Sequence, residues 1–216
     1  MSIAIENNQP KILRFFAHVL SYIFHPLFIP AYVAVVLIWL EPFNSLLINS
    51  FYKPRMLAMV ILYTAFFPGI VVFLAWRLKF IKNMYLEERT ERIIPFVSSM
   101  FFYFWIYYVS RNLAYFPVAF KQFLLGVFLS SASALFANMY TKISMHGIAM
   151  GGLVGFMFRQ LFVDIYFPRE YALLGLLVAG AVCTARLILK SHKPVDVYAG
   201  FFVGVLCQLV TPIIVS

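Results

Sequence analysis

The chain has 216 residues, of which 63% are hydrophobic, 19% aromatic and only 12% charged. One water-soluble core cannot bury that much apolar surface, so a soluble globular protein is excluded and lipid must surround most of the chain. The net charge of +9 comes from basic residues scattered at the ends of apolar runs. This distribution is typical of anchors at the membrane interface and of contacts with membrane lipids, and it argues against nucleic acid as a partner.

The N-terminal region and the cysteines give no sign of secretion or of a disulfide framework. Residues 1–10 are polar, and the apolar run that follows is too long for a signal peptide and lacks a small-residue cleavage site, so we expect no removable signal. Cys183 and Cys207 both lie within apolar segments. We expect them to be small buried side chains rather than metal ligands or disulfide partners.

A helix needs about 20 apolar residues to cross a bilayer core of about 30 Å. Pro26 and Pro30 interrupt the first segment of this kind. It could therefore form either one span or an interfacial helix followed by a short span. The connections between segments are too short to hold a second domain. We predict an all-α, polytopic transmembrane bundle of six or seven spans, forming a single domain over residues 1–216 in the cell (inner) membrane. The expected segments are 15–40, 56–77, 94–110, 119–140, 146–163, 171–190 and 196–215.

Glycines recur at four-residue spacing in two of these segments. One set is Gly147, Gly151 and Gly155, and the other is Gly200 and Gly204. Small residues at this spacing let two helix backbones approach closely in lipid. We interpret these glycines as packing positions and not as catalytic ones.

Three clusters of polar residues stand at the ends of the expected spans. Charged groups near membrane depth are costly and often mark a functional site. Two spans separate the first cluster from the second, and two more separate the second from the third, so all three are predicted to emerge on the same membrane face. In chain order the clusters contain Lys82, Arg89 and Arg92; then Lys142, Ser144 and His146; then Arg186, His192 and Asp196.

The basic residues of these clusters favour an anionic ligand. Guanidinium groups bind phosphate oxygens in pairs, so Arg89, Arg92 and Arg186 in one pocket would neutralise a phosphate monoester dianion. Ser144 stands where a helix begins, and free backbone N–H groups there favour an anion further. Lys82 and Lys142 are additional candidates for phosphate contact, although Lys142 could equally extend its amine to the membrane interface.

The two histidines of the clusters suit phosphoryl transfer. His192 and Asp196 are four residues apart and would share a helix face, since Pro194 is tolerated in a first turn. The carboxylate would then hold one imidazole N–H and leave the other ring nitrogen free to act as a nucleophile. His146 would serve as general acid on the leaving oxygen. His18 and His25 have no acidic residue nearby in the sequence and are interpreted as structural.

These residues resemble the motifs of the type 2 phosphatidic acid phosphatase superfamily, which are K-x6-R-P, P-S-G-H and S-R-x5-H-x3-D. The third motif is matched at Arg186, His192 and Asp196, with Ala185 in place of serine. This match is the most specific signal in the chain, and the resemblance covers roughly residues 80–215.

The other two motifs match in part. Ser144 and His146 keep the serine and histidine of the second motif, with Met145 in place of glycine. Lys82 and Arg89 have the spacing of the first, with Thr90 in place of proline. Arg89, Arg92 and Pro95 offer a rival alignment of that motif.

The resemblance implies a metal-independent lipid phosphatase that needs no cofactor. His192 would be the nucleophile, Asp196 would orient it, and His146 would protonate the leaving group, while the arginines and Ser144 would hold the phosphate. The expected substrate is a lipid phosphate monoester or a prenyl or lipid diphosphate, hydrolysed through a phosphohistidine.

Two other classes of function remain open from the sequence. One is a catalytically degenerate protein that binds or transports a lipid phosphate, which the departures at Thr90, Met145 and Ala185 favour. The other is an ion channel or proton relay that uses the same charges. The sequence does not fix which membrane face carries the clusters. Basic residues favour the cytoplasm, but several of them are proposed ligands, and members of the family more often face outward.

Overall fold

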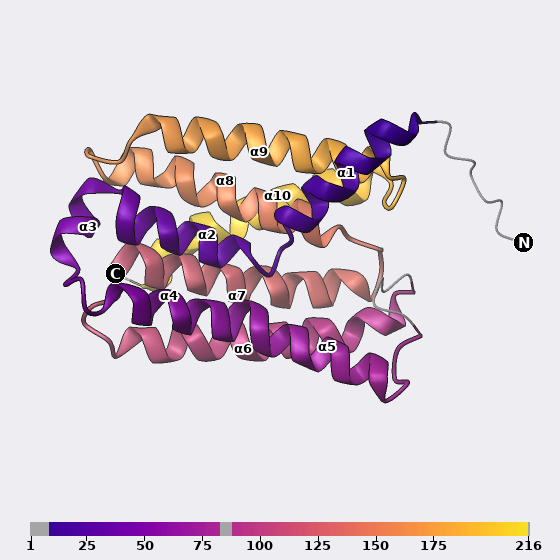
Figure 1. The fold of residues 1–216 in the computed structure, drawn as a ribbon, viewed down its shortest axis with the longest axis horizontal. Coiled ribbons are helices and arrows are strands. Elements are labelled where there is room, and N and C mark those ends of the chain that lie inside the picture. Colours follow the sequence, from indigo (N-terminus) through magenta and orange to yellow (C-terminus); the bar gives the residue numbers. More distant parts are fainter. Residues whose placement is uncertain (1–8, 83–87, 216) are drawn as a thin grey trace, which may run out of the picture.

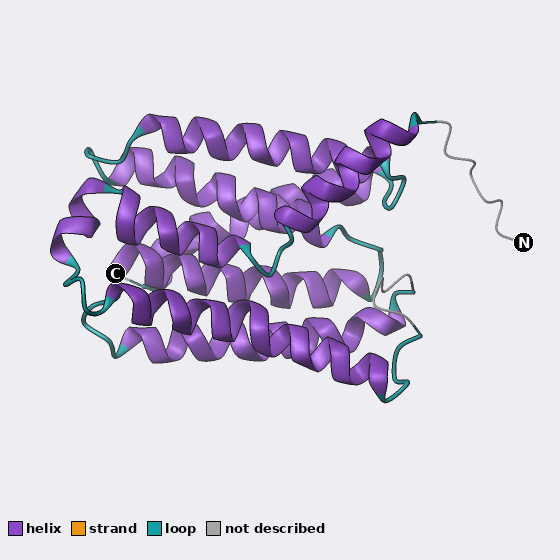
Figure 2. Cartoon of the chain, in the orientation of Figure 1, coloured by secondary structure: helices purple, strands orange, loops and turns teal. Residues whose placement is uncertain are grey.

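The structure is a computed structural model that describes residues 9–82 and 88–215. Every regular element within those residues is helical, and none is a strand (Figure 2). The predicted all-α class is confirmed. The helices are α1 (Lys11–Ile23), α2 (Ile29–Val35), η1 (Val36–Leu40), α3 (Pro42–Leu47), α4 (Lys53–Ile61), η2 (Leu62–Phe66), α5 (Phe67–Arg77), η3 (Thr90–Arg92), α6 (Ile93–Arg111), α7 (Val118–Asn138), α8 (Met145–Val163), α9 (Arg169–Ile188) and α10 (Pro194–Ile214).

Six helical stretches in the described residues are long and apolar enough to cross a membrane. Two of them are composite, because α4, η2 and α5 run on from one another and η3 leads into α6; the others are α7, α8, α9 and α10. Each stretch coincides with one of the last six segments predicted from hydrophobicity, and the ends agree to within a few residues. The protein is therefore a helical bundle with six candidate membrane spans.

The first predicted segment is divided into two helices. α1 ends at Ile23, and an apolar stretch formed by α2 and η1 begins at Ile29 after Pro26. At about 1.5 Å per residue, Ile29–Leu40 is about 18 Å long, which is well short of a bilayer core. The alternative of an initial helix followed by a short apolar helix is the one that the structure shows.

Helix α8 lies inside the bundle, where α9 and α10 both pack against it (Figure 1). Its contact with α10 depends on the two glycine sets. A Cβ atom at Gly151 would collide with the carbonyl of Phe201, and one at Gly204 would collide with the carbonyl of Ile148. A Cβ atom at Gly147 would lie 2.6 Å from the Val197 oxygen. These close approaches agree with the interpretation of the glycines as packing positions.

One end of the bundle collects the connections that carry the polar clusters. The turns between α5 and α6, between α7 and α8 and between α9 and α10 all lie at the right-hand end in Figure 1, and α1 crosses beside them. The helical packing thus brings segments that are about 50 residues apart to one place.

Candidate functional site

The first and second clusters are joined by hydrogen bonds from arginine side chains to backbone carbonyls. Nη1 of Arg89 donates to the Tyr140 oxygen at 2.8 Å, and Nη1 of Arg92 donates to the Ile143 oxygen at 3.3 Å. The Asn138 amide donates to the Arg89 carbonyl at 2.9 Å. These bonds fix the turn before α8 against the start of α6, so the count of spans correctly predicts that the two clusters meet.

The second and third clusters are joined in the same way. Nδ1 of His192 lies 2.9 Å from the Lys142 carbonyl oxygen, and the Ser144 backbone N–H donates to the Asp196 carbonyl at 3.2 Å. The turn before α8 therefore lies between the other two clusters and touches both.

The contact with Lys142 defines which ring nitrogen of His192 carries the proton. A backbone carbonyl can only accept, so Nδ1 must donate and Nε2 is left unprotonated in the neutral ring. Burial, and then the positive charges of Arg92 and Arg186, lower the pKa of His192 to about 4. The imidazole is thus neutral at physiological pH, with the lone pair that a nucleophile needs.

Asp196 does not occupy the position that the sequence suggested. Helix α10 begins at Pro194 with Lys193 as its N-cap, so His192 precedes the helix and the four-residue spacing does not place it above Asp196. The Asp196 carboxylate accepts the Lys193 backbone N–H at 3.2 Å. The contact that orients the imidazole comes from the Lys142 carbonyl, and Asp196 caps the helix.

Ser144 also has a local structural role. It is the N-cap of α8, and its hydroxyl oxygen accepts the Gly147 N–H at 3.2 Å. The residue has no exposed surface. Capping explains why a serine stands at this position, and the predicted contact of its hydroxyl with phosphate stays a prediction.

His146 faces residues that sequence reasoning left out of the site. Its Nε2 lies 3.1 Å from the Ser21 carbonyl oxygen, so this nitrogen carries a proton. The His25 ring meets the His146 ring edge to face, with centroids 5.5 Å apart. Leu27 N–H donates to Nδ1 of His25 at 3.4 Å. Ser21 and His25 come from α1 and the turn after it, outside the three motifs.

Positive charge is concentrated around the imidazoles. Nη1 of Arg186 reaches the Ser21 hydroxyl at 3.5 Å, and its buried Nε has no hydrogen-bond partner among the described residues. Arg92 is only 7% exposed and lies close enough to Arg186 for mutual repulsion, while Asp196 offsets part of its charge. Burial, followed by the charge of Arg186, lowers the pKa of His25 to about 4. A bound anion would relieve this repulsion.

Lys82 lies apart from this centre. Its amine is exposed and forms an ion pair with Glu88, while its backbone N–H donates to the buried Glu91 carboxylate at 2.8 Å. Arg89 is exposed as well. Lys82 thus contacts Glu88 and Glu91, and Arg89 contacts the Tyr140 carbonyl, whereas Arg92, Arg186 and Lys142 lie around His192.

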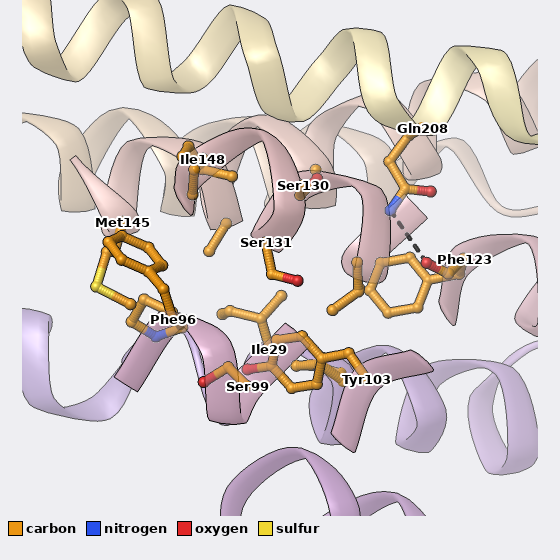
Figure 3. A pocket seen from close by; sticks show the side chains of 16 residues that line it. Ile29, Phe96, Ser99, Tyr103, Phe123, Ser130, Ser131, Met145, Ile148 and Gln208 are labelled. Atoms are coloured by element: carbon orange, nitrogen blue, oxygen red, sulfur yellow. Dashed lines mark hydrogen bonds between the residues drawn. The ribbon is translucent and has the colours of Figure 1, made fainter. Parts of the chain in front are cut away.

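A largely apolar pocket lies between the helices of the bundle. Its cavity volume is about 70 Å³, and it is lined by residues of α2, α6, α7, α8 and α10 and by Pro26. Met145 and Phe96 lie at one side of it and Gln208 and Phe123 at the other (Figure 3). Pro26 follows His25 and Met145 precedes His146, so two residues that neighbour these histidines in the chain belong to the lining of the pocket.

Comparisons of the chain with family models, with curated proteins and with solved structures found no match. No group of three or more His, Cys, Asp or Glu side chains among the described residues is arranged to hold a metal ion. The function is therefore inferred from the geometry of the site itself.

Proposed function

We propose that this protein is an integral membrane phosphatase of the type 2 phosphatidic acid phosphatase kind, acting on a lipid phosphate monoester or diphosphate. One observation carries the proposal. A neutral imidazole, His192, is oriented by the Lys142 carbonyl and lies among the cationic side chains of Arg92 and Arg186. A nucleophile beside guanidinium groups, in a bundle that also holds an apolar pocket, suits attack on the phosphorus of a lipid.

The proposed reaction has two steps. Nε2 of His192 forms a bond to phosphorus while the bond from phosphorus to the lipid oxygen breaks, and His146 gives a proton to that oxygen. A water molecule then attacks the phosphohistidine, its proton returns to His146, and inorganic phosphate leaves. The negative charge of a bound phosphate would favour the protonated form of His146.

The two arginines would hold the phosphate during both steps. Arg186 has an unpartnered Nε, and a bidentate contact with phosphate would satisfy it. Arg92 is fixed through the Ile143 carbonyl, which keeps its charge beside His192. The apolar pocket would take the hydrocarbon chain.

The test is the His192→Ala variant of the full chain, purified in detergent and assayed for phosphate release from phosphatidic acid, phosphatidylglycerophosphate and prenyl diphosphates. We expect a loss of at least about a thousandfold in kcat/KM. His18→Ala is the matched control, because His18 lies exposed on α1. Undiminished phosphate release by a folded His192→Ala protein would refute the mechanism.

A lipid-phosphate binding or transport protein is the second candidate. It is favoured by Met145, which lies at the pocket wall where the family motif has glycine, and by Ala185, which is buried where the motif has serine. Tight binding of a lipid phosphate with no release of phosphate from any substrate in the panel would select this function.

A further inference from the structure

The apolar pocket contains polar atoms that its own walls do not satisfy. Oγ of Ser130 and Oε1 of Gln208 are both buried and without a hydrogen-bond partner among the described residues. Ser130 is 7% exposed and Gln208 is 1% exposed. An unsatisfied buried polar atom typically costs about 1–3 kcal/mol, so two of them lining one cavity require an explanation.

Other polar groups of the same pocket are already paired. The Ser131 hydroxyl donates to the Phe128 carbonyl at 2.8 Å, and the Tyr103 hydroxyl hydrogen-bonds to the Ser99 side chain. The unpaired atoms are therefore confined to Ser130 and Gln208 and are not a general property of the cavity.

The Gln208 amide is held in a defined orientation. Its Nε2 donates to the Phe123 carbonyl at 3.2 Å, which leaves Oε1 as the acceptor without a donor (Figure 3). A Cβ atom at Gly126 would collide with this amide, so the glycine provides the space that the amide occupies. Ser130 is one helical turn after Gly126 on α7, which puts its hydroxyl on the same face of that helix.

The pair lies deep in the bundle. Gln208 is twelve positions after Asp196 on α10, or about 18 Å along the helix axis. A lipid whose phosphate lay beside His192 would thus extend its hydrocarbon chain past these two side chains, far from its head group. Water or a polar group of the lipid is needed there, and a plain hydrocarbon chain would leave both atoms unsatisfied.

We propose that the pocket binds a lipid chain that carries a hydroxyl group within its hydrophobic part. The hydroxyl donates to Oε1 of Gln208 and accepts from Oγ of Ser130, and the surrounding apolar wall takes the rest of the chain. This proposal rests on the proposed function only for the position of the lipid head group. The binding of the chain is argued from the residues that line the pocket.

The experiment measures binding of two probes without phosphate to the full chain in lipid nanodiscs. One probe is a long-chain fatty alcohol with a single mid-chain hydroxyl group, and the other is the unsubstituted alcohol of the same length. We expect the hydroxylated probe to bind about tenfold more tightly than the plain one. This is the gain in affinity expected from one hydrogen bond to a buried acceptor. Because neither probe has a phosphate, the outcome is independent of whether His192 is a nucleophile.

Variants separate the proposed contact from general packing. Gln208→Leu and Ser130→Ala should each lose the preference for the hydroxylated probe while still binding the plain one. Ser131→Ala should keep the preference, because the Ser131 hydroxyl is paired with Phe128. If water occupies the space between Ser130 and Gln208, the wild-type protein should bind both probes equally, and this result would overturn the proposal. So would an undiminished preference in Gln208→Leu, whose folding is checked by its thermal melting.

Discussion

Buried arginines occur at both ends of α8, and their surroundings differ. Arg159, near the C-terminal end, is 7% exposed and donates to the Thr211 hydroxyl at 2.9 Å and to the Gln160 amide oxygen at 3.2 Å. Its guanidinium carbon also lies 5.4 Å from the centre of the Phe156 ring. Thr211 of α10 and Gln160 of α8 each accept one hydrogen bond from Arg159, and the buried Nε of Arg159, like that of Arg186, has no partner among the described residues. No histidine is among these contacts of Arg159.

The N-terminal end of α8 brings guanidinium groups to imidazoles instead. Arg92 and Arg186 lie within electrostatic range of His192, and Arg186 also of His146. The difference shows that an arginine buried at membrane depth is not by itself a site. The N-terminal end of α8 differs from the C-terminal end in two ways. Imidazoles lie beside its arginines, and it has an excess of positive charge that an anion would balance.

The largest effect that we predict within this comparison is for His146→Ala. Loss of a general acid should lower kcat by about a thousandfold for a lipid phosphate, whose alkoxide leaves poorly without a proton. A phosphate ester with a good leaving group, such as nitrophenol, needs no such proton and should be affected far less. Comparison of kcat for the two kinds of ester checks this, and an equal loss for both would contradict the role of His146.

The next effect is a contrast between Arg186→Ala and Arg159→Met. We expect kcat/KM to fall about a hundredfold for Arg186→Ala, because a group that binds the phosphate is lost, and to change by less than about threefold per folded molecule for Arg159→Met. Thermal melting reports folding of both variants. The contrast would be broken if Arg159→Met lost as much activity per folded molecule as Arg186→Ala.

The protonation of His192 gives a third prediction. Its pKa of about 4, against an ordinary value of 6.5, means that the folded protein binds this proton more weakly than the unfolded chain does. The resulting stability is complete above about pH 6.5 and is lost as the pH falls toward 4, where both states become protonated. NMR titration of the ring, assigned with His192→Gln, should show half-protonation near pH 4. A midpoint near 6.5 would show that the ring is solvated.

The smallest effect is predicted for Lys82→Ala. Its amine is exposed and paired with Glu88, so removal should change kcat/KM by less than about threefold. A loss comparable to that of Arg186→Ala would show that Lys82 reaches the substrate, as the motif spacing suggested.

The spans were predictable because the length of an apolar run is a direct consequence of bilayer thickness. The meeting of the three clusters was predictable too, since an even number of spans separates them. In contrast, the partners of the histidines were not. His146 contacts Ser21 across 125 positions, and that contact depends on how α1 packs on α9. The only sequence feature that could have drawn attention to His25 is its position just before Pro26, at the end of the first helix.

The position of Asp196 relative to His192 was mispredicted for a local reason. The spacing of four residues implies a shared face only within a helix, and the helix begins two residues after His192. The proline at the first helical position fixes this boundary, so the carboxylate meets the backbone of Lys193 while the imidazole turns toward Lys142.

The central claim is that His192 carries the phosphoryl group, and trapping that intermediate tests it most directly. The purified protein is mixed with a lipid phosphate radiolabelled in its phosphate group, quenched in alkali within the first turnover and digested for mass spectrometry. We predict label on the peptide that contains His192, stable in alkali, lost in acid, and missing from His192→Ala. Turnover of the same substrate with no label on that peptide, or with label retained in the His192→Ala protein, would contradict the account.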